Sequence, residues 1–384
     1  MMYSRAAPAL AGSMNAIRRD GRLAAATHRH TKESSMLQKL PRVAWQAAAL
    51  ACCCTLAQAA DTVRKVDGKS ASGEIVRTSA TEVVLARSGG VEEKIPVVEI
   101  EEIQFDREPA PLRQARTDLR NGNYPRVLES LDKLRSAQDR PLMQQEAQFY
   151  RALATARLAL AGSGDPAAAL NLLVDFINQN KDSWRFMLAN ELAGDLLVSL
   201  DRHAEALKYY AELEKSPFAA HQMRAAVAQG NALVVQGKHA DALRQFEKVL
   251  ALPADNLDKR AAQQRLAATL GKALVLAETG EVDASVQLVE QAVAALDPED
   301  NDLNAQAYLT LGTCYRKKGD SRAAEWAFLW VDLIYSANPQ YHAQALANLK
   351  EVFAENGKPE RALQAENVLK ERYGNTKWAR VGTG

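Results

Sequence analysis

Residues 308–328 read YLTLGTCYRKKGDSRAAEWAF, two apolar-patterned segments joined by a turn at Gly319. In each segment apolar residues recur at intervals of three and four, which is typical of an amphipathic helix. Glycine at 319 can end the first helix in a left-handed cap at little steric cost. The small Ala324 lets the second helix approach the first closely, and Phe328 fills the groove beside it. The stretch therefore predicts an antiparallel helix pair.

The same pattern recurs along the chain from about residue 109, at spacings of 36 to 43 residues. The turns begin at Gly122, Gly164, Asp201, Gly237, Gly280, Gly319 and Gly357. The small residues that follow are Val127, Ala169, Ala206, Ala242, Ser285, Ala324 and Ala362, and the bulky partners are Leu131, Leu173, Tyr210, Phe246, Val289, Phe328 and, less well, Glu366. About seven such pairs predict a mainly α solenoid, because pairs too thin to bury their own apolar faces stack in a row.

This pattern resembles the tetratricopeptide repeat (TPR) family over about residues 109–373. The family's signature places are occupied in the sixth repeat by Tyr308, Leu311, Gly312, Tyr315, Gly319, Ala324 and Phe328, in the fourth by Gly230, Leu233, Gly237, Ala242 and Phe246, and in the third by Gly194, Ala206 and Tyr210. Family repeats have about 34 residues. We expect the extra residues here to form long loops between repeats, as in Ser216–His221 and Asp255–Lys259.

Residues 61–107 have a different pattern, which predicts a small β-module ahead of the helical array of residues 108–384. Short runs of Val and Ile alternate with polar residues near 62–66, 73–78, 82–87, 91–95 and 102–105, with turn signals at Asp67-Gly68 and Gly89-Gly90 between runs. Five short antiparallel strands are typical of an SH3-like or Sm-like barrel. We favour a role in covering the end of the solenoid or in docking a partner.

The first 60 residues are interpreted as a leader. From Met36, Lys39 and Arg42 precede an apolar run from Val43 to Leu56, and Ala57-Gln58-Ala59 supplies a small-x-small cleavage pattern. We interpret Met36 as the true start. The alternative is that residues 1–35, which are Arg-rich, belong to a transit-like leader that begins at Met1.

The leader predicts export, so we expect the mature protein in the periplasm or secreted, with no transmembrane segment. The apolar run is shorter than the roughly 20 residues that span a bilayer. Ala49-Leu50-Ala51-Cys52 is close to a lipoprotein signal, except that its large apolar residue is one place out. A lipid anchor at Cys52 is therefore an alternative that we do not favour.

Charge and residue types argue against nucleic-acid binding and catalysis. The net charge of +1 combines +6 in residues 1–60 with −5 in the remainder, and residues 61–108 alone carry −4, so no basic domain is left to neutralise phosphates. Beyond the leader only Cys314 remains, and the four His residues form no metal-binding or triad pattern in sequence. We predict no catalytic residue, no metal and no cofactor.

The TPR resemblance implies that the first helix of each pair lines a concave groove. On that face the resemblance places Glu191, Asp195, Asn231, Thr313, Arg316, Lys317, Glu351 and Glu355 as candidate partner-binding residues. Asn231 stands where some TPR domains bind a peptide carboxylate. The Lys that such a site needs four residues earlier is Val227, so that carboxylate site is not supported. The other interpretation is that all these residues are simply solvated.

Trp326 and Trp330 are a second candidate surface. They lie four residues apart on the second helix of the sixth pair, at places where the family usually has outward polar residues. Two exposed indoles would form a docking patch. The alternative is that they pack under a loop or under the last helix pair.

These observations lead to a non-catalytic scaffold that binds partner proteins or peptides in the cell envelope. The alternative is an accessory subunit of an envelope enzyme or secretion complex, with the β-module docking and the array recruiting substrate. A cluster of His and carboxylate side chains in the structure would favour a third class, an enzyme.

The leader makes a direct prediction for the exported protein. N-terminal sequencing of the mature chain should begin at Ala60 or Asp61, because cleavage follows the Ala57-Gln58-Ala59 pattern. A mature chain that begins at Cys52 with a lipid attached would establish the lipoprotein alternative. A chain that retains residues 36–60 would contradict the signal.

Overall fold

The computed structural model describes residues 60–87, 89–134, 140–252 and 259–380. The leader, including Met36 and Cys52, lies outside these residues. The strands are β1 (Asp61–Lys65), β2 (Ser70–Thr78), β3 (Glu82–Ala86), β4 (Glu92–Pro96) and β5 (Ile100–Gln104), with a 3-10 turn at Val97–Glu99. The sheet is antiparallel in the order β4-β3-β2-β1-β5. The predicted β-module is therefore present.

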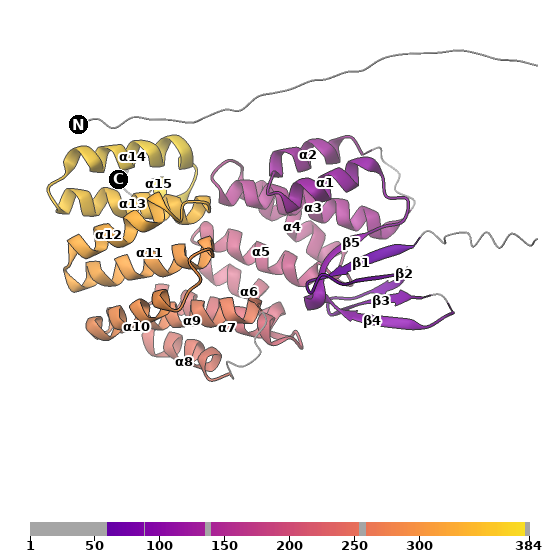
Figure 1. Cartoon of the computed structure of the whole chain (residues 1–384), viewed down its shortest axis with the longest axis horizontal. Coiled ribbons are helices and arrows are strands. Elements are labelled where there is room, and N and C mark those ends of the chain that lie inside the picture. The colour runs from indigo at the N-terminus through magenta and orange to yellow at the C-terminus, as the bar shows by residue number, and fades with distance from the viewer. Residues whose placement is uncertain (1–59, 88, 135–139, 253–258, 381–384) are drawn as a thin grey trace, which may run out of the picture. The chain divides into compact units, whose positions relative to one another are not determined.

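Helices follow the sheet as successive pairs (Figure 1). The first helices of the pairs are α1 (Ala110–Arg120), α3 (Pro141–Leu160), α5 (Phe186–Ser199), α7 (Ala219–Val235), α9 (Lys259–Glu278), α11 (Asn301–Lys318) and α13 (Pro339–Glu355). The second helices are α2 (Tyr124–Asp132), α4 (Pro166–Gln179), α6 (His203–Glu214), α8 (His239–Leu250), α10 (Val282–Ala294), α12 (Ser321–Leu333) and α14 (Pro359–Tyr373), and a short α15 (Lys377–Arg380) ends the array. Each first helix packs on its second helix, and each second helix on the next pair. The predicted solenoid of seven pairs is confirmed.

In three of the seven pairs a glycine of the first helix contacts an aromatic ring of the second. A Cβ atom placed at Gly312 of α11 would lie 2.5 Å from a ring carbon of Phe328 on α12. The same relation joins Gly194 to Tyr210, and Gly230 and Gly271 to the two sides of Phe246. These rings are fully or almost fully buried. The predicted small residues are buried too, whereas Glu366 is half-buried and pairs with Lys370.

Two local predictions need correction. In the second turn the left-handed residue is Gly162 and not Gly164, because α3 ends at Leu160 and Asp165 caps α4 by accepting from the N–H of Ala167. The connection before α7 is short, since α6 ends at Glu214 and His221 already lies inside α7. Much of the extra repeat length lies in long first helices, of which α9 has 20 residues and α11 has 18. Residues 253–258 lie outside the described part.

The core is a series of clusters along the array. The first cluster runs without a break from Val63 and Ile103 of the sheet to Leu112 of α1 and on to Tyr210 of α6. Three further clusters follow, over α7–α9, α9–α12 and α11–α14. The β-module therefore covers the apolar end of the first helix pair, as a capping element of a solenoid must.

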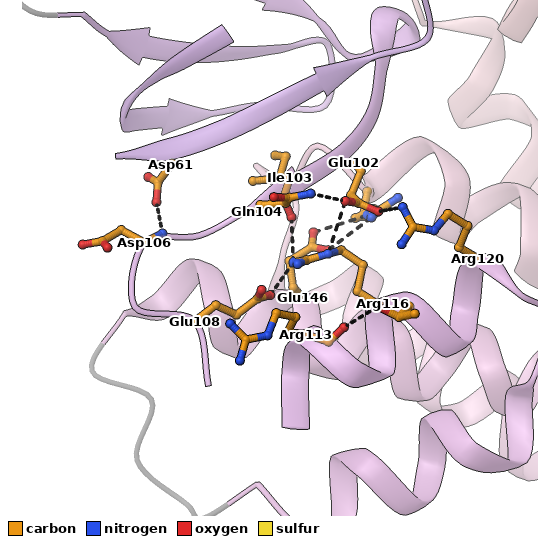
Figure 2. A network of polar contacts seen from close by, with 12 residues as sticks. Asp61, Glu102, Ile103, Gln104, Asp106, Glu108, Arg113, Arg116, Arg120 and Glu146 are labelled. Atoms are coloured by element: carbon orange, nitrogen blue, oxygen red, sulfur yellow. Dashed lines mark hydrogen bonds and ion pairs between the residues drawn. The ribbon is translucent and has the colours of Figure 1, made fainter. Parts of the chain in front are cut away.

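Buried ion pairs fix the β-module to the helices (Figure 2). Glu102 of β5 contacts Arg116 and Arg120 of α1 at 3.4 and 3.5 Å. Arg116 also donates to Glu108 at 2.5 Å and to the carbonyl of Ile103 at 3.3 Å. The side chains of Arg116, Glu102 and Glu108 are each less than a tenth exposed. The module is thus bonded to α1 as well as packed on it.

Asp61, the first residue of β1, makes a second junction. Its carboxylate accepts both guanidinium N–H groups of Arg140 at 2.7 Å and the backbone N–H groups of Ile75 and Asp106 at 3.1 and 2.9 Å. Burial opposes ionisation of Asp61, but these hydrogen bonds outweigh it and hold its pKa below the usual value. Stability from this group is present above its unfolded pKa of about 3.9 and is lost as pH falls through the lower folded pKa.

Asp61→Asn should therefore lower the free energy of unfolding at pH 7 by about 2–3 kcal/mol, because Arg140 loses its charged acceptor. The difference from wild type should shrink below about pH 4, where the wild-type carboxylate becomes protonated. Urea unfolding at pH 7 and at steps down to pH 3 measures both. Glu92→Gln, which changes an exposed carboxylate of the same sheet, is the matched control and should have little effect. A difference independent of pH would contradict the assigned role.

Candidate functional site

The inner face of the array is hollowed between the first helices. A hollow of about 180 Å³ lies among α7, α9, α11 and α13. Its polar lining consists of neutral groups: Asn231, Gln306, Thr310, Thr313, Tyr341 and Gln344. We call these six residues the inner groove. Gly271 and Ala267 of α9 line the same hollow.

The side chains of the inner groove are largely uncommitted. The amides of Asn231, Gln306 and Gln344 and the hydroxyl of Tyr341 make no hydrogen bond to any residue in the described ranges. Thr310 and Thr313 donate to backbone carbonyls one turn earlier in α11. Amides both donate and accept hydrogen bonds, so the groove can bind both the N–H and the C=O groups of a peptide backbone.

The charged groove candidates have another role. Glu191 and Asp195 of α5 both contact Arg224 of α7, with Glu191 at 2.9 Å. The hydroxyl of Tyr210 donates to Asp195 at 2.6 Å, and its ring lies under the Arg224 guanidinium at 4.9 Å. These side chains bond one repeat to the next.

The same holds near the C-terminal end. Arg316 of α11 contacts Glu351 and Glu355 of α13 at 2.7 and 2.8 Å, and Lys317 contacts Glu278 of α9 at 2.9 Å. Of the eight groove candidates, the structure brings Asn231 and Thr313 to the inner groove. The other six are engaged in ion pairs between first helices.

A second hollow, of about 430 Å³, lies where the C-terminal end of the array approaches α3 and α5. Its lining comes from α3, α5, α7, α13 and the segment Asn375–Arg380, and we call it the closure cavity. Lys377 of α15 lies 3.4 Å from Asp201, and the Thr376 side chain packs over Gly162. The last helices accordingly lie beside α3 and α5 (Figure 1). Asn231, Tyr341 and Gln344 line both hollows, so the two are neighbours.

The sequence did not predict the closure cavity or its residues Arg157, Tyr341 and Trp378. The Lys377–Asp201 contact joins positions 176 residues apart, and no local pattern reports such a separation. One signal was present: Lys377-Trp378 follows the last repeat, where a polar tail would otherwise be expected.

Trp326 and Trp330 lie on the surface of α12, 68% and 44% exposed. Trp330 stacks against Tyr308 and Tyr335 with ring centroids 5.5 and 6.2 Å apart. Leu333 and Ile334 beside them are also more than half exposed. We call Trp326, Trp330, Leu333 and Ile334 the aromatic face. The alternative in which both indoles are covered does not hold among the described residues.

One acid–histidine pair appears that the sequence did not show. His342 of α13 contacts Asp332 and the hydroxyl of Tyr373, each at 2.8 Å. Its imidazole is almost fully buried, and its partners lie on α12 and α14, so the three residues tie neighbouring helices together. Burial raises the pKa of the Cys314 thiol, which disfavours a thiolate. The described residues contain no group of His, Cys, Asp and Glu that could hold a metal.

Comparison with known proteins gives one family match, to part of the array. Residues 227–301, which run from α7 of the fourth helix pair to the first residue of α11, match the tetratricopeptide repeat family model. No curated protein matches the chain in sequence. Among the described helices, none is long and apolar enough to cross a membrane.

Solved structures with low identity are similar to parts of the chain. A tetratricopeptide repeat protein from Parabacteroides merdae is 16% identical, with a TM-score of 0.48 over 68% of this chain and 91% of its own. A Rap protein solved with the competence and sporulation factor is 16% identical, with a TM-score of 0.49 over 70% and 74%. The type IV pilus biogenesis factor PilW is 15% identical, with a TM-score of 0.35 over 70% and 95%.

Proposed function

We propose that these tetratricopeptide repeats form a non-catalytic scaffold of the cell envelope or periplasm, which binds partner proteins or peptides on the inner face of the array. The observation that carries the proposal is the inner groove, where neutral hydrogen-bonding groups from successive first helices line one hollow and four of the six make no side-chain hydrogen bond to a described residue. The six charged groove candidates are instead engaged in ion pairs between first helices.

The chemistry of the groove fits an extended peptide better than a small molecule. The hollow of about 180 Å³ is smaller than the roughly 300–1,000 Å³ of small-molecule pockets. Here the polar lining consists of amides and hydroxyls, which can replace the water bonded to a peptide backbone. Spacing of such groups along a solenoid suits a ligand that is itself long.

The aromatic face offers a second contact for a partner protein. Tryptophan is enriched among the residues that carry binding energy in interfaces, and large exposed apolar patches are uncommon on monomers. Trp330 is held in place by stacking on Tyr308, so its ring would lose little conformational freedom on binding. Trp326, the more exposed of the two indoles, would be covered by the partner.

The envelope location rests on the leader. An apolar run after Lys39 and Arg42 and a cleavage pattern at Ala57-Gln58-Ala59 support export.

An accessory subunit of an envelope enzyme or secretion complex is the second candidate, favoured by the sheet. Strand β4 is an edge strand of the described sheet, and an edge can accept a strand from another chain. A stable stoichiometric enzyme partner that is lost when β4 is altered would favour this candidate.

Photo-crosslinking tests the scaffold. A benzophenone amino acid is placed at Gln306 in the inner groove, and at Gln287 on the exposed surface of α10 as the matched control. With envelope extract, position 306 should give discrete adducts that mass spectrometry identifies, and position 287 should not. Equal labelling at both positions, or none at 306, would contradict binding at the inner groove.

A double variant tests the aromatic face in the same crosslinking experiment. Trp326→Ala with Trp330→Ala should reduce partner capture while the array stays folded. Unchanged capture together with a lower melting temperature would show that the two indoles serve stability alone.

A further inference from the structure

The aromatic face is one continuous stripe along α12. Its members stand at positions 326, 330, 333 and 334, and this spacing of four, seven and eight residues places them on one side of a helix. At a rise of about 1.5 Å per residue the stripe is about 12 Å long. The opposite side of α12, with Ala324 and Phe328, already fills the core of the pair. The packing of α12 on α11 therefore leaves the stripe available to another molecule.

The area of the stripe is large enough for an interface between two copies of the chain. At their exposed fractions, the four side chains present on the order of 500 Å² of apolar surface, as much as the largest apolar patch of a typical monomer. Two such faces in contact would bury about 1,000 Å², the size from which a specific interface is stable, before the polar rim is counted.

The first end of the stripe is positively charged. Arg322 lies one helical turn before Trp326 on the same side of α12 and is exposed. Its guanidinium makes no ion pair or side-chain hydrogen bond to any residue that the structure describes. Arg322 therefore extends the aromatic face with a cation that has no counterion within the described chain.

The other end of the stripe borders a negatively charged turn at the start of α11. The side-chain amide of Asn301 donates to the carbonyl of Ile334 at 3.5 Å, which joins this turn to the end of α12. The turn carries three exposed carboxylates that form no ion pair with a described residue, namely those of Asp297, Glu299 and Asp302. Of these, Asp302 is held beside the end of α12, because it accepts from the amide of Asn338 at 3.3 Å. The stripe thus runs from a cation to a group of carboxylates.

A surface with this pattern is complementary to itself when it is turned end for end. In a twofold interface a residue at one end contacts the residue at the other end of the second copy, and the same contact occurs twice. Two antiparallel α12 helices would bring apolar side chains together at the centre. Each Arg322 would then lie against the acidic turn that holds Asp302 in the other copy.

We propose that the aromatic face binds the same face of a second copy of this chain, with the two α12 helices antiparallel about a twofold axis. The proposal rests on the proposed function, because it names the partner that covers the aromatic face. The resulting dimer carries two inner grooves, and two linked sites retain a repetitive partner more strongly than one. Loss of the dimer would therefore also reduce partner capture.

Sedimentation velocity of the purified full chain across a dilution series tests the dimer. The wild type should sediment as a dimer that dissociates on dilution. Trp326→Ala with Leu333→Ala should raise the Kd of the dimer roughly a hundredfold, because each truncation is felt twice across the axis. Both side chains are mostly exposed, so the variant should fold, which thermal unfolding by circular dichroism checks. Leu363→Ala, which truncates an exposed leucine of α14, is the matched control and should leave the Kd unchanged.

A charge swap tests the antiparallel arrangement. Arg322→Glu alone and Asp302→Lys alone should each raise the Kd about tenfold, because each places like charges against each other. The two substitutions combined in one chain should restore the Kd of the wild type, since the reversed charges again face each other across the axis. Reversals that weaken the dimer without this rescue would overturn the arrangement.

The occupant of the face is identified by photo-crosslinking at position 326. An adduct with the mass of two chains supports the proposal, and adducts with a different protein alone would overturn it. A chain that is monomeric at every concentration, or a dimer that survives Trp326→Ala with Leu333→Ala, would overturn it as well. Each of these outcomes leaves peptide binding by the inner groove to be judged separately, by crosslinking at Gln306.

Discussion

The close approach of the two helices of a pair is the constraint on which the rest of this structure depends. A glycine facing an aromatic ring allows it in three pairs, and a small buried residue on the second helix allows it in the others. Gly312 faces Phe328, Gly194 faces Tyr210, and Phe246 lies between Gly230 and Gly271. Where the two axes come this near, each pair is a thin slab with apolar residues on both sides. Such a slab cannot bury its own faces, so it stacks on the next one, and the four core clusters follow the chain in order.

The stacking of helix pairs in a row determines where the polar side chains lie. The first helices lie side by side, which lets Arg224 reach Asp195 and Arg316 reach Glu351 across repeat boundaries. The six charged side chains predicted for the groove are thereby engaged between repeats, and the neutral amides are left to line the hollow. A different element covers the apolar face at each end of the array: the β-module before α1 and the short α15 after α14.

Much of the fold could be predicted from the sequence, because each helix pair is a local object. The turn, the small residue and the bulky residue lie within about ten positions of one another, as in Gly319, Ala324 and Phe328. The position of Asn231 and Thr313 in the repeat pattern also predicted correctly that they lie on the inner face. Helical periodicity could not show that Arg316 forms ion pairs with Glu351 and Glu355, because it gives the side of the helix on which a residue lies and not its partners on other helices. Nor could it show the closure cavity, which depends on the summed twist of all repeats.

The most direct test of the account is the free energy of unfolding of Gly312→Ala, measured by urea denaturation. In an ordinary helix this change stabilises by about 1 kcal/mol. Here the added methyl meets the fully buried ring of Phe328, so we expect a net loss of roughly 1–3 kcal/mol. In a Phe328→Leu background the same substitution should cost much less. A Gly312→Ala chain as stable as wild type with Phe328 intact would contradict the account.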